Sequence, residues 1–196
     1  MTQSMSSTGL ATGSIRAAIV GGTGYSGAEL MRLLLQHPRV RVDFVASPSG
    51  AGRPLSDHHP ALRNMTQLPL SPMPANDAAW PEVDCIFLCL PHGVSRDLVP
   101  LLPRGPRVID LSGDFRLRDG EIFAKYYGTH PPSDDWQKQF VYGQPEIGVR
   151  QTIAKARYIA NPGCFATAVI LALAPLVKER LICLLYTSDA ADDTPC

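Results

Sequence analysis

The chain contains one cysteine whose position suits covalent chemistry. Cys164 follows the turn sequence Asn161 to Gly163 and opens the apolar stretch FATAVILALAPLV, which predicts a helix over 164–178. A thiol at the first residue of a helix lies near free backbone N–H groups and the positive end of the helix dipole, and both stabilise a thiolate. The same N–H groups can hold an oxyanion. We therefore predict that Cys164 is a nucleophile; a buried structural cysteine that caps the helix is the alternative.

A glycine-rich segment nearer the N-terminus suits the binding of a dinucleotide. Residues 22–27 read GTGYSG and match the pattern G-x-G-x-x-G, after the apolar run IRAAIV at 15–20 and before a helix expected over 26–36. Glycines permit a tight turn and let the backbone approach a pyrophosphate, and the helix N-terminus offers it N–H groups. A plain strand-to-helix turn is the alternative. The expected cofactor contacts are Gly21, Gly22, Thr23, Gly24, Tyr25, Ser26 and Gly27.

The end of the second expected strand, over 40–46, indicates which nicotinamide cofactor binds. NAD sites usually carry an acidic residue there, but Asp43 lies inside the strand. Ser47 and Pro48 follow the strand instead, and Arg53 comes soon after. Because hydroxyl groups and a cation suit a 2′-phosphate, we predict that Ser47 and Arg53 bind NADP. A solvated surface loop is the alternative.

A histidine loop follows the third main strand, expected over 83–90. Ligands of doubly wound sheets bind at the carboxyl ends of the strands, so this loop should reach the cofactor. We predict that His92 is a cofactor contact and not the catalytic base, which makes the expected contacts of this loop Pro91, His92 and Gly93.

The sequence DLSGDFR, at 110–116, comes at the end of the next expected strand, over 107–111. Its arginine, Arg116, can grip a carboxylate or a phosphate with two hydrogen bonds, although an arginine in such a loop also commonly forms a structural salt bridge. The predicted substrate contacts are Ser112, Arg116 and Asn161.

Short apolar runs alternate with helical segments along the chain. We expect strands over 15–20, 40–46, 83–90, 107–111 and 157–160, and helices over 26–36, 94–102 and 164–178. Continuous apolar strands between helices indicate βαβ units and a parallel sheet buried on both faces. The predicted fold class is therefore α/β, with a Rossmann-like doubly wound parallel sheet.

Five separated motifs agree with one enzyme family. GGTGYSGAEL, CLPHGVS, DLSGDFRL, YGQPEI and NPGCFATA, in this order and spacing, resemble N-acetyl-gamma-glutamyl-phosphate reductase of arginine biosynthesis, from about Arg16 to Ile182. The resemblance implies NADPH-dependent reduction of N-acetyl-L-glutamyl 5-phosphate to N-acetyl-L-glutamate 5-semialdehyde, with release of phosphate, through a thioester on Cys164. It also implies that the glycines of the first loop surround the cofactor phosphates and that residues 47–53 contact the adenosine end.

The sequence departs from the pattern of that family in three respects. Pro48 stands where the family often has arginine, so Arg53 would have to bind the 2′-phosphate. Phe165 and Ala166 replace the usual Tyr-Pro after the cysteine. The family's catalytic histidine belongs to a second domain, which we expect this chain to lack. We therefore expect the chain to be inactive alone and the full-length protein to be an active homo-oligomer.

The expected organisation has four parts. Residues 1–14 are predicted to be a flexible leader, 15–155 the dinucleotide-binding domain, and 156–182 the start of a truncated α+β catalytic and dimerisation domain. The last stretch, 183–196, reads CLLYTSDAADDTPC and follows no period. Because its beginning matches the translation of a common sequencing adapter, we predict a non-native tail.

Composition narrows the classes of function. The formal net charge is zero and 18% of the residues are charged, which argues against nucleic acid or a membrane surface as partner. The sequence shows neither a secretory signal nor an apolar stretch long enough to span a membrane, so we expect a cytoplasmic enzyme with a small-molecule acyl-phosphate substrate. We expect no metal site, because Cys85 and Cys89 lack a second pair of ligands.

Three other functions stay open. Aspartate-semialdehyde dehydrogenase and aminoadipyl-phosphate reductase share the acyl-phosphate chemistry and a cysteine at a helix start. A non-catalytic dinucleotide-binding module, such as a redox-sensing regulator, belongs to another class and predicts no selective reactivity of Cys164.

Overall fold

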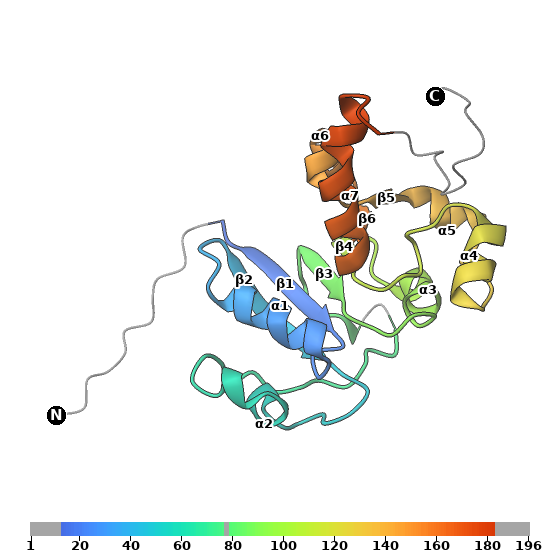
Figure 1. Ribbon diagram of the computed structural model, residues 1–196. Coiled ribbons are helices and arrows are strands. Elements are labelled where there is room, and N and C mark those ends of the chain that lie inside the picture. Colours follow the sequence, from blue (N-terminus) through green and yellow to red (C-terminus); the bar gives the residue numbers. More distant parts are fainter. Residues whose placement is uncertain (1–12, 77–78, 183–196) are drawn as a thin grey trace.

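The computed structural model describes residues 13–76 and 79–182 and contains one six-stranded sheet in the order β2-β1-β3-β4-β6-β5 (Figure 1). Every pair of neighbouring strands is parallel. The expected α/β, Rossmann-like fold is therefore confirmed. The strands are β1 (Ile15–Val20), β2 (Val40–Ala46), β3 (Cys85–Leu88), β4 (Arg107–Asp110), β5 (Phe140–Tyr142) and β6 (Tyr158–Ala160).

Two apolar cores lie on the two faces of this sheet. Helix α1 places Met31 on one face, against Ile19 and Val42. The segment after β3 places Val99 on the other face, against Ile86 and its neighbours. Both faces are covered because parallel strands are apolar on both sides. The helices are α1 (Tyr25–Leu35), α2 (Leu55–His58), α3 (Ser95–Leu98), α4 (Gly120–Tyr127), α5 (Asp134–Gln139), α6 (Arg150–Lys155) and α7 (Cys164–Lys178).

The expected helix over 94–102 is shorter than predicted. Helix α3 ends at Leu98, and a 3-10 turn, Val99–Leu101, completes the segment. Pro100 explains the break, because it has no N–H group to donate and its ring clashes with the carbonyl four residues earlier in an α-helix. The strand expected over 83–90 is likewise shorter, at Cys85–Leu88.

The region 113–145 holds more regular structure than its sequence suggests. It contains α4, α5 and the edge strand β5, whose three residues are too few to show a period. Strand β5 pairs with β6, and β6 pairs with β4, so residues 158–160 belong to the same sheet as the glycine-rich segment. The proposed division into two domains at 155 stays a prediction. Most of the predicted leader and the whole predicted tail, 183–196, lie outside the described residues.

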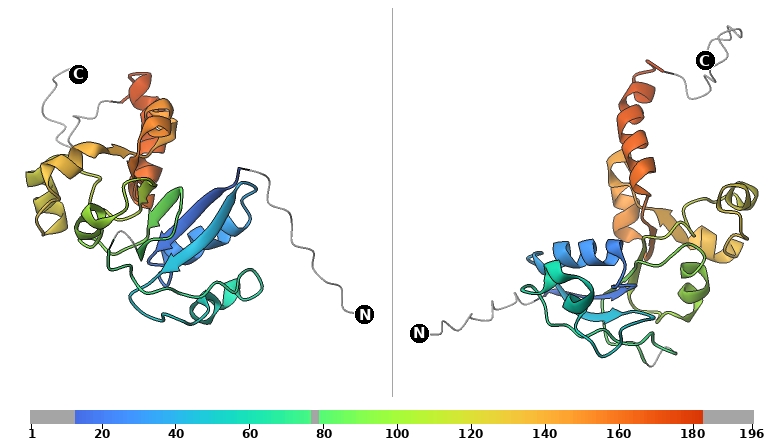
Figure 2. Two further views of the ribbon diagram at one scale, coloured as in Figure 1. Left: turned by 180° about the vertical axis from the view of Figure 1, so that it is seen from behind. Right: turned by 60° about the horizontal axis from the view of Figure 1, so that its bottom comes forward.

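Helix α7 leaves the sheet and projects away from the rest of the molecule (Figure 2). Its bounds match the sequence prediction, and none of its residues is buried. Helix α1, in contrast, buries Gly27 and Met31. Among the described residues, no helix combines the length and the apolar character that crossing a membrane requires.

Candidate active site at the carboxyl edge of the sheet

The predicted site residues follow the carboxyl ends of five strands. The glycine turn follows β1, Ser47 follows β2, the His92 loop follows β3, the loop 111–116 follows β4, and Cys164 comes four residues after β6. Since all six strands run in parallel, these segments lie along one edge of the sheet. That edge is where doubly wound folds bind their ligands.

Three glycines of the first loop are required for packing. Gly21 has a φ of +87°, and a Cβ there would lie 2.2 Å from the carbonyl oxygen of Cys89. A Cβ on Gly22 would lie 2.2 Å from Cγ1 of Val45, and one on Gly27 would lie 2.5 Å from the oxygen of Gly21. These glycines let β1, β2, β3 and the start of α1 meet closely.

Gly24 differs from the other glycines of the loop. The nearest atom to a Cβ built there is 3.5 Å away, and the residue is exposed. Gly24 is also the N-cap of α1, with no side chain capping the helix. The first-turn N–H groups of α1 therefore face an open surface that an anion can occupy, which fits the pyrophosphate of a dinucleotide.

Some of the side chains around the glycine turn are buried, and others are exposed. The hydroxyl of buried Ser47 lies 2.8 Å from that of Thr23, so the ends of β1 and β2 are joined by a hydrogen bond. Arg53 is exposed and lies 3.5 Å from the Nε2 atom of His58. Tyr25 is 95% exposed. Burial raises the pKa of the Cys89 thiol, and Ser26 lowers it by a smaller amount.

The loops after β3 and β4 hold each other through three hydrogen bonds. The N–H of Gly113 donates to Nδ1 of His92 over 2.7 Å. In the opposite direction, the N–H groups of Gly93 and Arg96 donate to the carboxylate of Asp114 over 2.7 and 3.0 Å. Asp114 is fully buried, so these bonds are shielded from water. The two loops therefore act as one rigid unit.

Ser112 lies inside this unit. Its hydroxyl donates to the carboxylate of Asp110 over 2.7 Å and accepts the N–H of Asp114 over 3.1 Å. Burial raises the pKa of Asp110 above the ordinary carboxyl value, and the bonds from Ser112 oppose that rise. The structure thus commits the Ser112 hydroxyl to the protein, and its predicted contact with substrate remains a prediction.

Arg116 joins the β4 loop to the turn before the nucleophile. Its Nε donates to the carbonyl of Asn161 over 2.8 Å, and its Nη2 donates to the carbonyl of Leu111 over 2.7 Å. The remaining nitrogen, Nη1, would lie 3.0 Å from a Cβ on Gly163. Arg116 forms no salt bridge within the part of the chain that the structure describes. Its charge is therefore held beside the nucleophile turn without an internal anion.

Asn161 is used within the same turn. Its side-chain nitrogen donates to the carbonyl of Pro162 over 3.0 Å, and its own carbonyl accepts from Arg116. The side chain therefore shapes the turn that leads into α7, and its assignment to the substrate stays a prediction.

Cys164 is exposed and is the first residue of α7. The N-cap residue before it is Gly163, and among the described residues no side chain bonds the N–H groups of the first turn. The other two cysteines of the described chain, Cys85 and Cys89, are buried, and burial raises the pKa of each thiol to about 12. The exposure of Cys164 therefore argues against the alternative that it is a buried structural cysteine. The N–H groups of the first turn of α7 lie next to its sulfur and can stabilise a negative charge there.

Two tyrosines of this edge were not predicted as site residues. The phenol of Tyr127, from α4, packs against Gly113, where a Cβ would lie 2.5 Å from its hydroxyl oxygen. Tyr142 ends β5, and burial raises its pKa while the nearby charge of Arg116 opposes that rise. Tyr142 belongs to the motif YGQPEI and could have been singled out, but no sequence spacing connects Tyr127 to Gly113.

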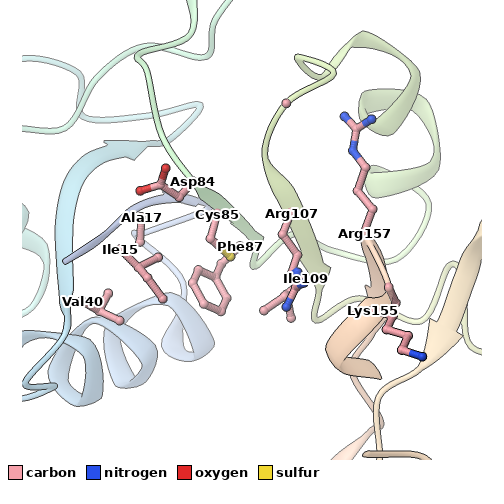
Figure 3. A pocket seen from close by; sticks show the side chains of 12 residues that line it. Ile15, Ala17, Val40, Asp84, Cys85, Phe87, Arg107, Ile109, Lys155 and Arg157 are labelled. Atoms are coloured by element: carbon pink, nitrogen blue, oxygen red, sulfur yellow. The ribbon is translucent and has the colours of Figure 1, made fainter. Parts of the chain in front are cut away.

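A separate cavity of about 700 Å³ lies at the opposite, amino edge of the sheet (Figure 3). Its walls include Ala17 and Phe87 of the sheet, with Arg107 and Lys155 at its rim. None of the predicted site residues lines it. We therefore place the candidate active site at the carboxyl edge and not in this cavity.

The sequence of this chain is similar to those of known proteins. Residues 16–156 match the family model described as semialdehyde dehydrogenase, NAD binding domain. N-acetyl-gamma-glutamyl-phosphate reductase of Acidithiobacillus ferrooxidans is 47% identical over 169 residues, which are 86% of this chain and 48% of that protein. The corresponding reductase of Nitrosococcus oceani is 48% identical over 170 residues, 86% of this chain and 49% of that protein.

A relative with another substrate in its name is nearly as similar. The LysW-L-2-aminoadipate/LysW-L-glutamate phosphate reductase of Sulfurisphaera tokodaii is 44% identical over 169 residues, 86% of this chain and 48% of that protein. The chain thus spans about half the length of the curated relatives it matches.

Among solved structures, aspartate semialdehyde dehydrogenase of Candida albicans with NADP resembles this chain with a TM-score of 0.57. The two are 16% identical, and the match covers 85% of this chain and 47% of that one. At this identity the similarity establishes a shared fold.

Proposed function

The chain belongs to the semialdehyde dehydrogenase NAD-binding family, and from this premise we propose that it carries the cofactor and nucleophile part of an N-acetyl-gamma-glutamyl-phosphate reductase. The reaction would reduce N-acetyl-L-glutamyl 5-phosphate to N-acetyl-L-glutamate 5-semialdehyde. One observation carries the proposal: an exposed cysteine opens a helix at the same edge of the sheet as an open glycine turn.

The residues present fit NADP. The open surface at Gly24 and the first turn of α1 would hold the pyrophosphate. The half-buried hydroxyl of Thr23, positioned by its bond to the buried Ser47, and the exposed guanidinium of Arg53 would hold the ribose and its 2′-phosphate. Bound NADPH would supply the hydride that reduces a thioester to an aldehyde.

Cys164 would perform the covalent step. Its thiolate attacks the acyl carbon, a carbon–sulfur bond forms, and the carbon–oxygen bond to phosphate breaks, so that phosphate leaves with the electron pair. The N–H groups at the start of α7 stabilise the negative oxygen that develops on the acyl carbon. Arg116, with Nη1 beside Gly163, is placed to bind the phosphate or a carboxylate of the substrate.

The identity of the acyl phosphate is the finer part of the proposal. The motifs DLSGDFRL and CLPHGVS favour the acetylglutamyl substrate, whereas aminoadipyl reductases have similar overall identity to this chain. Assays of the full-length gene product with N-acetylglutamyl phosphate, aminoadipyl phosphate on its carrier protein, and aspartyl phosphate decide between them. We expect NADPH oxidation with the first substrate, and turnover only with another would refute the assignment.

The test of the chemistry compares single cysteine variants of the full-length gene product. Cys164→Ser should lower turnover at least about a thousandfold, because an alcohol is a far weaker nucleophile than a thiolate. Cys85→Ala, at a buried sulfur on the opposite edge of the sheet, is the matched control and should retain most activity. The 196-residue chain alone should bind NADPH without turnover. Normal turnover by the Cys164→Ser protein would end the proposal, and NADPH binding without turnover by the unmodified full-length protein would favour the non-catalytic module.

A further inference from the structure

We propose that His92 is a fixed hydrogen-bond donor, protonated on Nε2, for an uncharged oxygen on the nicotinamide half of the dinucleotide, and that Tyr127 holds its ring in place. The inference rests on the proposed function, because it assumes a dinucleotide at this edge. It goes further in assigning the protonated atom, the part of the ligand it meets, and a positioning residue from α4.

The hydrogen bond from Gly113 determines where the imidazole carries its proton. The backbone N–H of Gly113 lies 2.7 Å from Nδ1 of His92, and an N–H group can only donate. Nδ1 must therefore be the unprotonated, accepting nitrogen. A neutral ring then has its proton on Nε2, which makes Nε2 a donor and never an acceptor.

The surroundings of His92 limit rotation of its ring. Tyr127 meets the imidazole edge-on, with ring centroids 5.3 Å apart and an interplanar angle of 69°. Tyr127 is itself stacked on the fully buried Phe123 at 4.7 Å and packs against Gly113. The carboxylate of Asp114 accepts a hydrogen bond from the N–H of Gly93, the residue that follows His92. The imidazole is therefore held from its Nδ1 side while the residue remains exposed to solvent.

The strand order places this donor beside the path of the nicotinamide half. Strands β3 and β4 lie between β1, which carries the glycine turn, and β6, which leads to Cys164. Neighbouring strands are about 4.8 Å apart, so a cofactor with its pyrophosphate at β1 must cross the ends of β3 and β4 to bring its nicotinamide to Cys164. In the part of the chain that the structure describes, Nε2 of His92 has no hydrogen-bond partner.

The chemistry of the held ring selects the kind of oxygen. A phosphate would favour an imidazole protonated on both nitrogens, but a proton on Nδ1 would point at the N–H of Gly113 and break that hydrogen bond. The neutral donor therefore suits a ribose hydroxyl or the carboxamide oxygen of the nicotinamide. Adenosine 2′,5′-bisphosphate contains only the other end of NADPH. Its one free ribose hydroxyl belongs to the adenosine, and it lacks both the nicotinamide and the ribose that carries the nicotinamide.

Binding measurements on the full chain test this assignment with two ligands. His92→Asn keeps an oxygen near the position of Nδ1 to accept from Gly113 but loses the Nε2 donor. By calorimetry we expect it to bind NADPH about five- to tenfold more weakly, the effect of one hydrogen bond, and adenosine 2′,5′-bisphosphate unchanged. Equal loss for both ligands, or loss for neither, would overturn the inference. Failure of the unmodified chain to bind either ligand would instead refute the proposed cofactor.

Nuclear magnetic resonance of the nitrogen-labelled chain tests the tautomer and the role of Tyr127 directly. The His92 resonances, assigned by their absence in His92→Asn, should show a protonated Nε2 and an unprotonated Nδ1 at neutral pH. Tyr127→Phe keeps the ring contact and should preserve this pattern and the NADPH affinity. Tyr127→Ala should mix the tautomers and weaken NADPH binding about threefold or more. A protonated Nδ1 in the unmodified chain, or no effect of Tyr127→Ala, would contradict the inference.

Discussion

Two strand–turn–helix units of this molecule begin alike and continue differently. In both β1–α1 and β6–α7, a parallel strand ends at the carboxyl edge and a glycine in extended conformation caps the helix without a side-chain bond. Both helices therefore present free N–H groups to the same edge. Helix α1 buries residues against the sheet, whereas α7 buries none.

The difference shows which property each unit encodes locally. The chemistry of a helix N-terminus depends on a few residues around the cap, so both units have it. The packing of the rest of the helix depends on neighbours. Within the described chain α1 packs against β1 and β2, whereas α7 meets the 3-10 turn Pro145–Ile147 and buries none of its residues. Near its start α7 is held by Arg116 through the carbonyl of Asn161. Substitutions of packed residues should therefore change the free energy of unfolding, and substitutions at the helix N-termini should change binding or reactivity.

The largest expected effect is the difference in reactivity between Cys164, at the start of α7, and the two buried cysteines of the central strand β3 and its end. At about pH 7.5, a thiol with a pKa near 12 is thiolate in roughly three molecules per hundred thousand, and Cys85 and Cys89 are also buried. The exposed Cys164 should react with iodoacetamide at least about a thousandfold faster than either. Peptide mapping by mass spectrometry follows each sulfur separately. Comparable rates for Cys85 or Cys89 under native conditions would show that the sheet around β3 opens readily and is not well packed.

Much of this pattern could be read from the sequence. The apolar runs at 15–20 and 164–178 and the glycines between strand and helix were sufficient to predict both units. The sequence did not predict that the two units share one sheet, because residues 156–182 were assigned to the start of a second domain. The role of Asp114 could not be predicted, because its partners Gly93 and Arg96 lie about twenty residues earlier and are met only once β3 and β4 pair. Strand β5 was missed because three residues cannot show a period.

A pair of glycine variants should sharpen the contrast between packing and binding within the first unit. Gly21→Ala places a Cβ 2.2 Å from a backbone oxygen at a positive φ, so we expect a loss of about 2–4 kcal/mol in the free energy of unfolding. Gly24→Ala meets nothing nearer than 3.5 Å and should change stability by less than about 1 kcal/mol, while weakening NADPH binding tenfold or more. Urea titration and calorimetry measure the two quantities. The assignment of Gly24 to the pyrophosphate fails if Gly24→Ala binds NADPH normally.

Alkaline pH should weaken the folded state through the buried sulfurs. The thiols of Cys85 and Cys89 have their pKa raised from 9.0 to about 12 by burial, so between these values the unfolded chain loses protons that the folded chain retains. Their contribution to stability is thus complete below pH 9.0 and is lost as the pH rises toward 12. The free energy of unfolding should fall by about 1 kcal/mol per thiol in the first pH unit above 9.0. Urea titrations at several pH values measure this slope. Cys85→Ala should remove part of it, whereas Cys164→Ala, at an exposed sulfur, should leave it unchanged.

The smallest expected effect concerns the packing of α7 itself. Leu171 is 41% exposed in a helix with no buried residue, and alanine is at least as good a helix former as leucine. Leu171→Ala should therefore change the free energy of unfolding by less than about 0.5 kcal/mol. Met31→Ala is the matched variant in α1 and should cost about 2–5 kcal/mol, since its side chain is fully buried against Ile19 and Val42. Urea titration of the two proteins measures the contrast. A cost of 2 kcal/mol or more for Leu171→Ala would mean that α7 packs against other parts of this chain, and the distinction between the two units would then disappear.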